Sequence, residues 1–214
     1  MKTTFYFIRH GESLGNANGI LLGQSNMDLT ELGYKQAEAT AERLSEVKID
    51  RIYSSDLTRA YNTAIPHARL RNTEVIADKE LREVYAGDWD GRSFKEIAEK
   101  WPDAFTPEWH KNYGLFCYPN GESNVEIGER FYKAVVRIAG ENPDSVVMVV
   151  SHAAILRSFW ALITGVTPEN MGRDVQFPSN ASYSIAEYEN GKFKAVAFSC
   201  DDHLSSVGIT KINI

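Results

Sequence analysis

Two histidines and two arginines of this chain lie at or just after the ends of short apolar runs. His10 and its neighbour Arg9 end the apolar stretch FYFIRH, and His152 directly follows the apolar run SVVMVVS. Arg59 lies in DLTRAYNTAI, just after a further apolar stretch, RIYSS. Guanidinium groups offer planar paired donors to anionic oxygens, and an imidazole can donate a hydrogen bond or attack as a nucleophile. These residue types indicate a pocket for a tetrahedral dianion.

The segments around these residues predict one α/β domain. Short apolar runs at residues 4–9, 51–55, 74–77 and 145–151 indicate strands that alternate with helical patterns. In open α/β sheets, ligands bind outside the carboxyl ends of the strands. Both histidines come directly after strands, and the arginine of DLTRAYNTAI lies near the start of a helix that follows one. All three side chains are therefore expected to share one cleft.

Local signals predict where several elements begin and end. Thr30 is the expected N-cap of a helix that runs to about residue 47, and capping-box patterns at residues 93–96 and 123–126 open two more helices. Pro66 is expected to kink or end the helix that begins near residue 56. Residues 182–199 predict a hairpin.

Composition narrows the class of protein. The 214 residues are taken as a single domain spanning 1–214, by a prior of about 150 residues per domain. A net charge of -6 argues against broad attraction to nucleic acid or to an anionic membrane. No apolar run approaches the ~20 residues of a membrane span, and no cleavage-like segment opens the chain, so the cytoplasm is the expected location.

Four motifs resemble those of a known family in order and spacing. They are RHGES with Asn16, YSSDLTRAYNTA, LREVYAGDWDG and VVSHAAILR. Together they resemble the histidine phosphatase superfamily, also called phosphoglycerate mutase-like, over residues 4 to 160. The resemblance implies a three-layer α/β/α sandwich with a mostly parallel central sheet.

The resemblance also implies a role for each matching residue. His10 would be the nucleophile that becomes phosphorylated, and Arg9, Arg59 and His152 would bind the phosphoryl group. Glu83 of LREVY would be the general acid and base.

Two asparagines extend this implied site. Asn16 would add a contact to the phosphate. Asn180, in FPSNASYS, lies just before a predicted strand, and the resemblance places this segment near the pocket.

The chemistry of phosphate esters calls for such residues on its own account. A phosphomonoester carries about -1.5 to -2 charge at neutral pH, so a neutral imidazole is a better attacker than an anion. Nearby arginines disfavour protonation of His10. Arg9, Arg59 and a protonated His152 would then stabilise the oxygens of the transition state. Neither a metal nor an organic cofactor is expected, and the expected partner is a small-molecule phosphate monoester.

Residues 86–130, called the cap segment below, are where choice of substrate is expected to reside. They are rich in aromatic side chains around proline and glycine breaks, which could pack on the core, line the leaving-group side of the pocket, or do both. A mutase must bind a second anionic end of its substrate, yet this segment holds five basic residues against nine acidic ones. That balance favours a phosphatase.

Two other functions stay open on the sequence. One is a cofactor-dependent phosphoglycerate mutase. The other is a non-catalytic module that binds a phosphorylated ligand, although such a module would have no use for both a nucleophile at His10 and an acid at Glu83.

Overall fold

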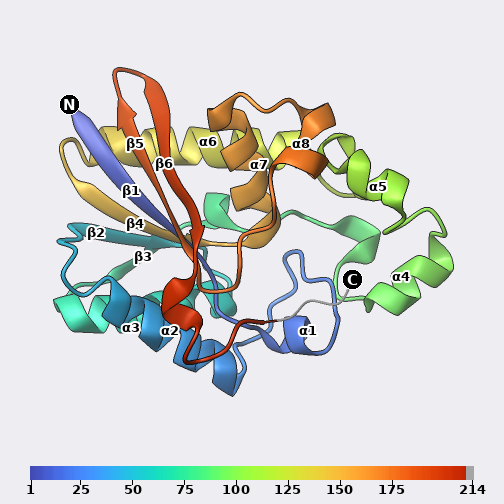
Figure 1. The fold of residues 1–214 in the computed structure, drawn as a ribbon, viewed down its shortest axis with the longest axis horizontal. Helices are drawn as coiled ribbons and strands as arrows, with labels where there is room; N and C mark the ends of the chain where they lie inside the picture. The colour runs from blue at the N-terminus through green and yellow to red at the C-terminus, as the bar shows by residue number, and fades with distance from the viewer. Residues whose placement is uncertain (211–214) are drawn as a thin grey trace.

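A six-stranded sheet in the order β3-β2-β4-β1-β5-β6 forms the centre of the computed structural model, which describes residues 1–210 (Figure 1). The neighbouring pairs β3–β2, β2–β4 and β4–β1 are parallel, whereas β5 and β6 join antiparallel. The sheet is therefore mixed and mostly parallel, as expected. The strands are β1 (Lys2–Arg9), β2 (Arg51–Ser54), β3 (Val75–Ala77), β4 (Val146–Ser151), β5 (Tyr183–Glu189) and β6 (Lys192–Cys200).

Helices cover both faces of this sheet. α2 and α3 lie on one face, and α6 and α7 lie on the other (Figure 1). The helices of the described chain are α1 (Leu14–Ala17), α2 (Glu31–Arg43), α3 (Thr58–Arg71), α4 (Phe94–Lys100), α5 (Pro107–Lys111), α6 (Asn124–Glu141), α7 (Ala153–Thr164) and α8 (Pro168–Asp174). Short 3-10 turns lie at η1 (Lys79–Leu81), η2 (Gly87–Trp89), η3 (Tyr113–Leu115) and η4 (Asp202–Leu204). Among these helices, none combines the length and the apolar character needed to cross a bilayer.

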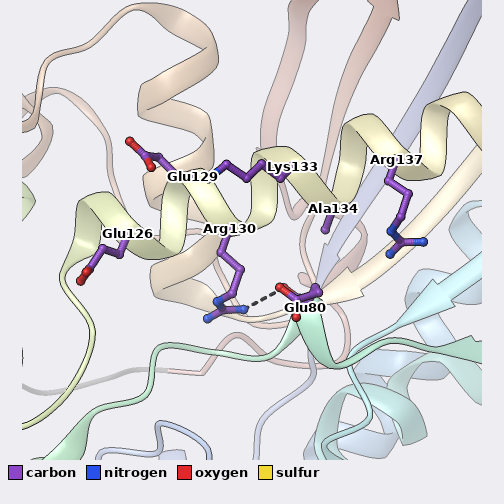
Figure 2. Close-up of a pocket in the computed structure, with 7 residues that line it drawn as sticks. All are labelled: Glu80, Glu126, Glu129, Arg130, Lys133, Ala134 and Arg137. Carbon is purple, nitrogen blue, oxygen red and sulfur yellow. Dashed lines mark hydrogen bonds between the residues drawn. The ribbon is translucent and has the colours of Figure 1, made fainter.

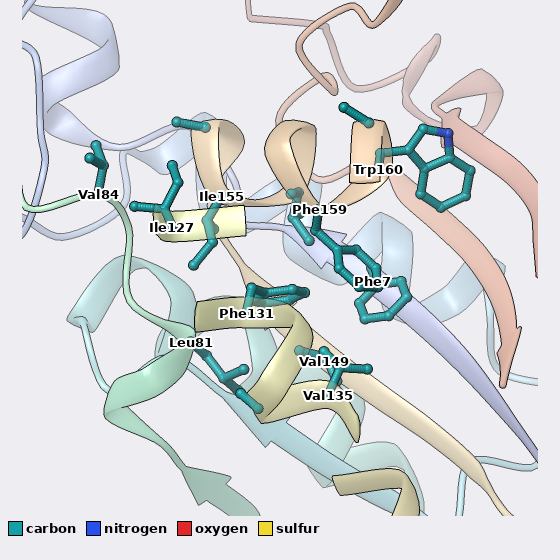
Figure 3. Close-up of a cluster of buried hydrophobic side chains, with 14 of the residues drawn as sticks. Phe7, Leu81, Val84, Ile127, Phe131, Val135, Val149, Ile155, Phe159 and Trp160 are labelled. Carbon is teal, nitrogen blue, oxygen red and sulfur yellow. The ribbon is translucent and has the colours of Figure 1, made fainter. Parts of the chain in front are cut away.

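Alternation along β1 divides the core between the two faces. Phe7 packs on the α6/α7 side, with its ring centroid 5.8 Å from that of Phe131 and 5.1 Å from that of Phe159 (Figure 3). Ile8, the next residue, belongs to the cluster on the α2/α3 side with Ile52. Successive side chains of a strand point to opposite faces, so one apolar strand serves both layers.

The parallel strands end together at one edge. Arg9 pairs in register with Ser151, and Ser54 lies opposite Val150. The residues that follow β1, β2 and β4 therefore meet at the same carboxyl edge, which confirms the arrangement expected from the sequence.

Several predicted boundaries hold, although α2 ends at Arg43 and not near residue 47. Thr30 caps α2 by accepting from Gly33 N at 3.0 Å, and both predicted capping boxes form. Pro66 does not end its helix, because α3 continues to Arg71. Proline removes one backbone donor. Here the surrounding turns are held by burial, since Ala64, Pro66 and Ala68 are all buried.

The cap segment folds around a buried tryptophan. Trp89 is 1% exposed and contacts the rings of Trp101, Phe105, Trp109 and others at centroid distances of 5.0–6.2 Å. The same aromatic cluster is continuous with the core under α6 and α7. The cap segment is thus packed firmly on the domain.

Candidate active site

A cavity of about 300 Å³ opens at the carboxyl edge of the sheet. Five of the expected residues line it: Arg9, His10, Asn16, Arg59 and Glu83. The sixth, His152, is fully buried behind the wall, and its ring centroid lies 5.1 Å from that of His10. Three strand ends and the loop after β3 thus bring together all six residues chosen from the sequence.

A glycine-tight turn presents His10 to the cavity. A Cβ atom at Gly11 would lie 2.4 Å from the carbonyl oxygen of Gly33, so only glycine lets this turn pack against the start of α2. Nδ1 of His10 lies 2.7 Å from the carbonyl oxygen of Gly11, which can only accept, so Nδ1 carries the hydrogen and Nε2 keeps its lone pair. Burial, then Arg59 and Arg9, lower the pKa of His10 well below its usual value. At neutral pH the ring is an uncharged nucleophile.

His152 shares the buried, cationic surroundings of His10, which favour its neutral form. The protonated form expected from the sequence concerns the transition state and stays a prediction. Burial and then Arg59 lower its pKa well below the ordinary value. Its Nε2 lies 2.8 Å from Ser55 Oγ, which also accepts from Leu57 N, and a serine hydrogen directed at Nε2 is the arrangement that puts the ring hydrogen on the unpartnered Nδ1. In that arrangement Nδ1 of His152 is a donor.

Both arginines are held by carbonyl groups rather than by carboxylates. Arg9 Nη1 donates to Pro178 O at 2.6 Å, while Arg59 donates from Nη1 to Ser25 O and from Nη2 to Gly23 O, both at 2.8 Å. Burial lowers the pKa of each guanidinium to about 10, so both stay charged at neutral pH. Carbonyl anchoring fixes the two groups without neutralising them.

Three buried donors around His10 have no acceptor within residues 1–210. They are Arg9 Nε, Arg59 Nε and His152 Nδ1. A buried polar group without a partner is costly and uncommon in folded proteins. Three of them around one histidine, two on cationic groups, indicate that a ligand with several anionic oxygens supplies the missing acceptors. Farther along the cavity wall, Trp109 Nε1 and the Tyr113 hydroxyl are also buried without a partner.

The start of α7 fixes Glu83 in its loop after β3. Its Oε1 accepts from Val84 N at 3.0 Å and Ile155 N at 3.1 Å, and its Oε2 accepts from Ala154 N at 3.0 Å. The first amides of a helix have no intrahelical acceptors and favour negative charge. Oε2 takes a single amide, so it retains a lone pair toward the cavity.

The two asparagines support the turn after β1. Asn16 Oδ1 accepts from Ser13 and from Asn180 Nδ2, and no acceptor in the described chain takes the Nδ2 hydrogens of Asn16. Asn180 Nδ2 also donates to His10 O at 3.0 Å. Asn16 thus has amide hydrogens available to a ligand, while Asn180 holds the backbone of the histidine turn.

Two supporting residues escaped sequence reasoning. Asp90 of the cap segment accepts from the backbone amides of Gly23, Gln24 and Ser25, and carbonyls of this same loop hold Arg59. Ser55, which orients His152, directly follows β2. Because Ser55 follows a strand, the rule that placed the histidines at the carboxyl edge could also have identified it. No local sequence signal predicts the contact between Asp90 and residues 23–25.

No cluster of three or more His, Cys, Asp or Glu side chains suited to a metal ion occurs within residues 1–210. The positive charge at the cavity comes from its arginines.

Comparison with known proteins identifies the family. A model of the histidine phosphatase superfamily (branch 1) matches residues 5–201. The chain belongs to this superfamily. The resemblance inferred from the four motifs is confirmed, and the chain is a histidine phosphatase superfamily phosphatase.

Individual relatives agree with this assignment. The metal-independent phosphoserine phosphatase of Arabidopsis thaliana is 36% identical over 208 residues, which span 96% of this chain and 85% of that protein. YhfR of Bacillus stearothermophilus, a solved structure, has a TM-score of 0.88 and 28% identity, covering 95% of this chain and 100% of its own. Mycobacterial glucosyl-3-phosphoglycerate phosphatase complexed with VO3 has a TM-score of 0.85 and 27% identity, covering 92% of this chain and 98% of its own.

Proposed function

We propose that this histidine phosphatase hydrolyses phosphate monoesters without a metal, through a phosphohistidine at Nε2 of His10. The observation that carries the proposal is the set of three unpartnered donors, from Arg9, Arg59 and His152, around a histidine whose Nε2 is unprotonated. A bound phosphoryl group would satisfy all three donors at once.

In the first step, Nε2 of His10 attacks phosphorus and the bond from phosphorus to the ester oxygen breaks. Glu83 gives a proton to the departing oxygen, which leaves as the alcohol. Arg9, Arg59 and His152 donate to the remaining oxygens, where negative charge is concentrated in the transition state. The products of this step are phosphohistidine, the free alcohol and the Glu83 carboxylate.

In the second step, water attacks the phosphorus of phosphohistidine. The Glu83 carboxylate takes a proton from that water, and the bond from phosphorus to Nε2 breaks. Inorganic phosphate leaves, and His10 and Glu83 return to their starting protonation states.

A phosphoglycerate mutase is the second candidate, and the placement of charges in the cap segment argues against it. Lys95 pairs with Glu99, Lys111 pairs with Glu108, and Arg92 donates to Asp88 O. None of the five basic side chains that the cap segment holds lines the cavity within the described chain. A second anionic end of a bisphosphate would therefore meet no cation. Release of free phosphate from 3-phosphoglycerate, without formation of 2-phosphoglycerate, would distinguish hydrolysis from mutase activity.

The test is to trap the intermediate. Phosphorus-labelled substrate quenched during turnover should leave acid-labile, base-stable label on the wild-type protein, and none on His10→Ala. Label on a serine instead would contradict the proposal. Because the Arabidopsis relative is named a phosphoserine phosphatase, phosphoserine belongs in the first screen, beside sugar, glycerate, nucleotide and aryl phosphates.

A further inference from the structure

Beyond the phosphate-binding end, most side chains that line the cavity are apolar, and the hydroxyl-bearing ones are Ser13, Tyr113 and Tyr118. The apolar ones include Ile20, Leu22, Phe94, Phe105, Trp109 and Phe177, which come from the loop after α1, the cap segment and the segment after α8. We propose that the substrate is the phosphate monoester of an apolar alkyl or aryl alcohol. The inference rests on the proposed function, since the ester phosphate must lie against His10.

The distribution of charge supports this choice. In the part of the chain that the structure describes, the arginines lining the cavity are Arg9 and Arg59, both at the phosphate end, and Glu83 is the lining carboxylate. Away from these three residues, the ammonium and carboxylate groups of phosphoserine, or the carboxylate of a phosphoglycerate, would meet no charged side chain of the described lining, only the hydroxyls of Ser13, Tyr113 and Tyr118. Removing a charge from water without a partner is strongly unfavourable. An apolar leaving group would instead be stabilised by burying its surface against the same side chains.

The apolar wall is already formed in the free protein. The ring of Phe105 packs edge-on against Phe94, with centroids 5.4 Å apart, and against Trp109 at 5.2 Å. The cavity of about 300 Å³ lies at the small end of the range for ligand sites. A phosphate and an alcohol of one ring, or of a short chain, match this size.

The first measurement is kcat/KM along a series from ethyl to hexyl phosphate. The leaving groups of this series have nearly equal basicity, so the chemical step stays constant while apolar surface grows. Each methylene that reaches the wall should raise kcat/KM by about fourfold. Phosphoserine should fall below ethyl phosphate. A series that is flat or falls with chain length, or a preference for phosphoserine, would overturn the inference.

Variants locate the effect. Phe94→Ala and Phe105→Ala should reduce the gain per methylene, whereas Trp101→Ala should keep it, because Trp101 packs on Trp89 in the same segment but does not line the cavity. An equal loss in all three would attribute the gain to general packing and contradict the inference. Phosphohistidine trapping on each protein keeps the two proposals apart: label without chain-length preference refutes this inference, and no label with any substrate refutes the proposed function.

Independent contacts point to Arg130 as a positioning residue for Glu83. From α6, its Nη1 donates to Glu80 O at 2.7 Å and Arg82 O at 3.0 Å, and its Nη2 donates to Glu83 O at 3.2 Å. Figure 2 shows this side chain reaching from the helix to the loop at Glu80. Arg130 also forms a two-point ion pair with Glu122, at 2.9 and 3.0 Å.

Glu122, the ion-pair partner of Arg130, binds the same loop on the C-terminal side of Glu83. Its Oε2 accepts from Tyr85 N at 2.7 Å, so the ion pair holds backbone groups both before and after Val84. A planar guanidinium can engage several acceptors in fixed directions, which a lysine cannot reproduce. We infer that Arg130 keeps the Glu83 carboxyl aimed at the departing oxygen, without touching substrate. This inference also rests on the proposed acid role of Glu83.

A test of Arg130 compares two leaving groups. Arg130→Met should slow kcat on an alkyl phosphate, up to the ~10²–10⁴-fold that general acid catalysis supplies, while the burst with nitrophenyl phosphate changes little. Arg130→Lys should recover only part of the alkyl activity. The matched control is Arg137→Met, which removes an arginine of the same helix that pairs with Asp78 and Glu141 instead.

Equal losses on both leaving groups, or the same selective loss in Arg137→Met, would refute the positioning role. If Glu83→Gln itself shows no difference between the leaving groups, the acid role in the proposed function fails instead.

Discussion

Replacement of Glu83 by glutamine is the sharpest test of the acid and base roles. The substitution keeps the shape of the side chain but removes the proton that the proposed first step requires. Alkyl phosphates, whose leaving groups are poor, should lose most of the ~10²–10⁴-fold that a general acid provides. Nitrophenyl phosphate should lose much less in the first step, because nitrophenolate leaves without a proton.

The structure adds a stability effect of its own. A glutamine oxygen at the Oε1 position could still accept from Val84 N and Ile155 N, but its NH₂ group would then face Ala154 N, which lies 3.0 Å from Oε2. Two donors would oppose each other, leaving one buried amide unsatisfied at a cost of about 1–3 kcal/mol. Urea unfolding of Glu83→Gln should show a loss of this order.

The assay is rapid quench with both substrates on wild type and Glu83→Gln. The mutant should release nitrophenol in a burst and then accumulate labelled phosphohistidine, because the second step lacks its base. An equal loss on alkyl and aryl phosphates, with no burst and no trapped intermediate, would refute the role of Glu83. The proton would then have to come from another source, and Asp88, an alternative carboxylate in the nearby cap segment, is exposed and does not line the cavity.

Three further predictions follow from the arrangement of charge and hydrogen bonds. Activity should survive exhaustive treatment with a metal chelator, and a loss of activity that added divalent metal restores would count against the mechanism. Vanadate should inhibit the enzyme, because it can accept hydrogen bonds from Arg9, Arg59 and His152 as the transition state would. Asp90→Asn should weaken vanadate inhibition by about tenfold or more, since a charge-assisted hydrogen bond contributes about 1.5–3 kcal/mol and the loop that anchors Arg59 would loosen. His67 is buried without a hydrogen-bond partner in the described chain, and burial, aided by Arg71, lowers its pKa to about 3. Its neutral form therefore stabilises the fold fully above pH 6.5 and progressively less below it, by about 1.4 kcal/mol per pH unit down to about pH 3. Urea unfolding between pH 7.5 and 5 should show a smaller pH dependence for His67→Leu than for wild type, and parallel curves would contradict the assignment.

Residues that follow strands could be predicted because the signal is local. The apolar run before His152 predicts a central strand, and the carboxyl-edge rule then places His10, His152 and Arg59 together without any knowledge of the packing. Capping also needs only a few neighbouring residues, so Thr30 was correctly assigned.

What could not be predicted depends on contacts between distant segments. The pKa of His152 is lowered by complete burial and by the nearby Arg59 and His10, and no pattern in VVSHAAILR predicts these surroundings. Glu83 is fixed by amides of α7 some seventy residues away, and the loop at residues 23–25 is fixed by Asp90 of the cap segment. Pro66 was expected on local grounds to kink or end its helix, and it does not end it, because α3 continues to Arg71.

The carbonyl anchoring of the arginines bears on how the enzyme responds to its own product. Arg9 and Arg59 form no ion pair within residues 1–210. Besides burial, the nearby Glu83 carboxylate raises the pKa of the Arg9 guanidinium, and Arg59 lowers it to a smaller extent. The two guanidinium groups are therefore available to any small dianion. Inorganic phosphate carries the same tetrahedral oxygens as the group that has just been transferred, so the site has little means to reject it. Turnover is therefore expected to slow as free phosphate accumulates, which would make the phosphate status of the surroundings, and not the supply of ester alone, a control on the rate.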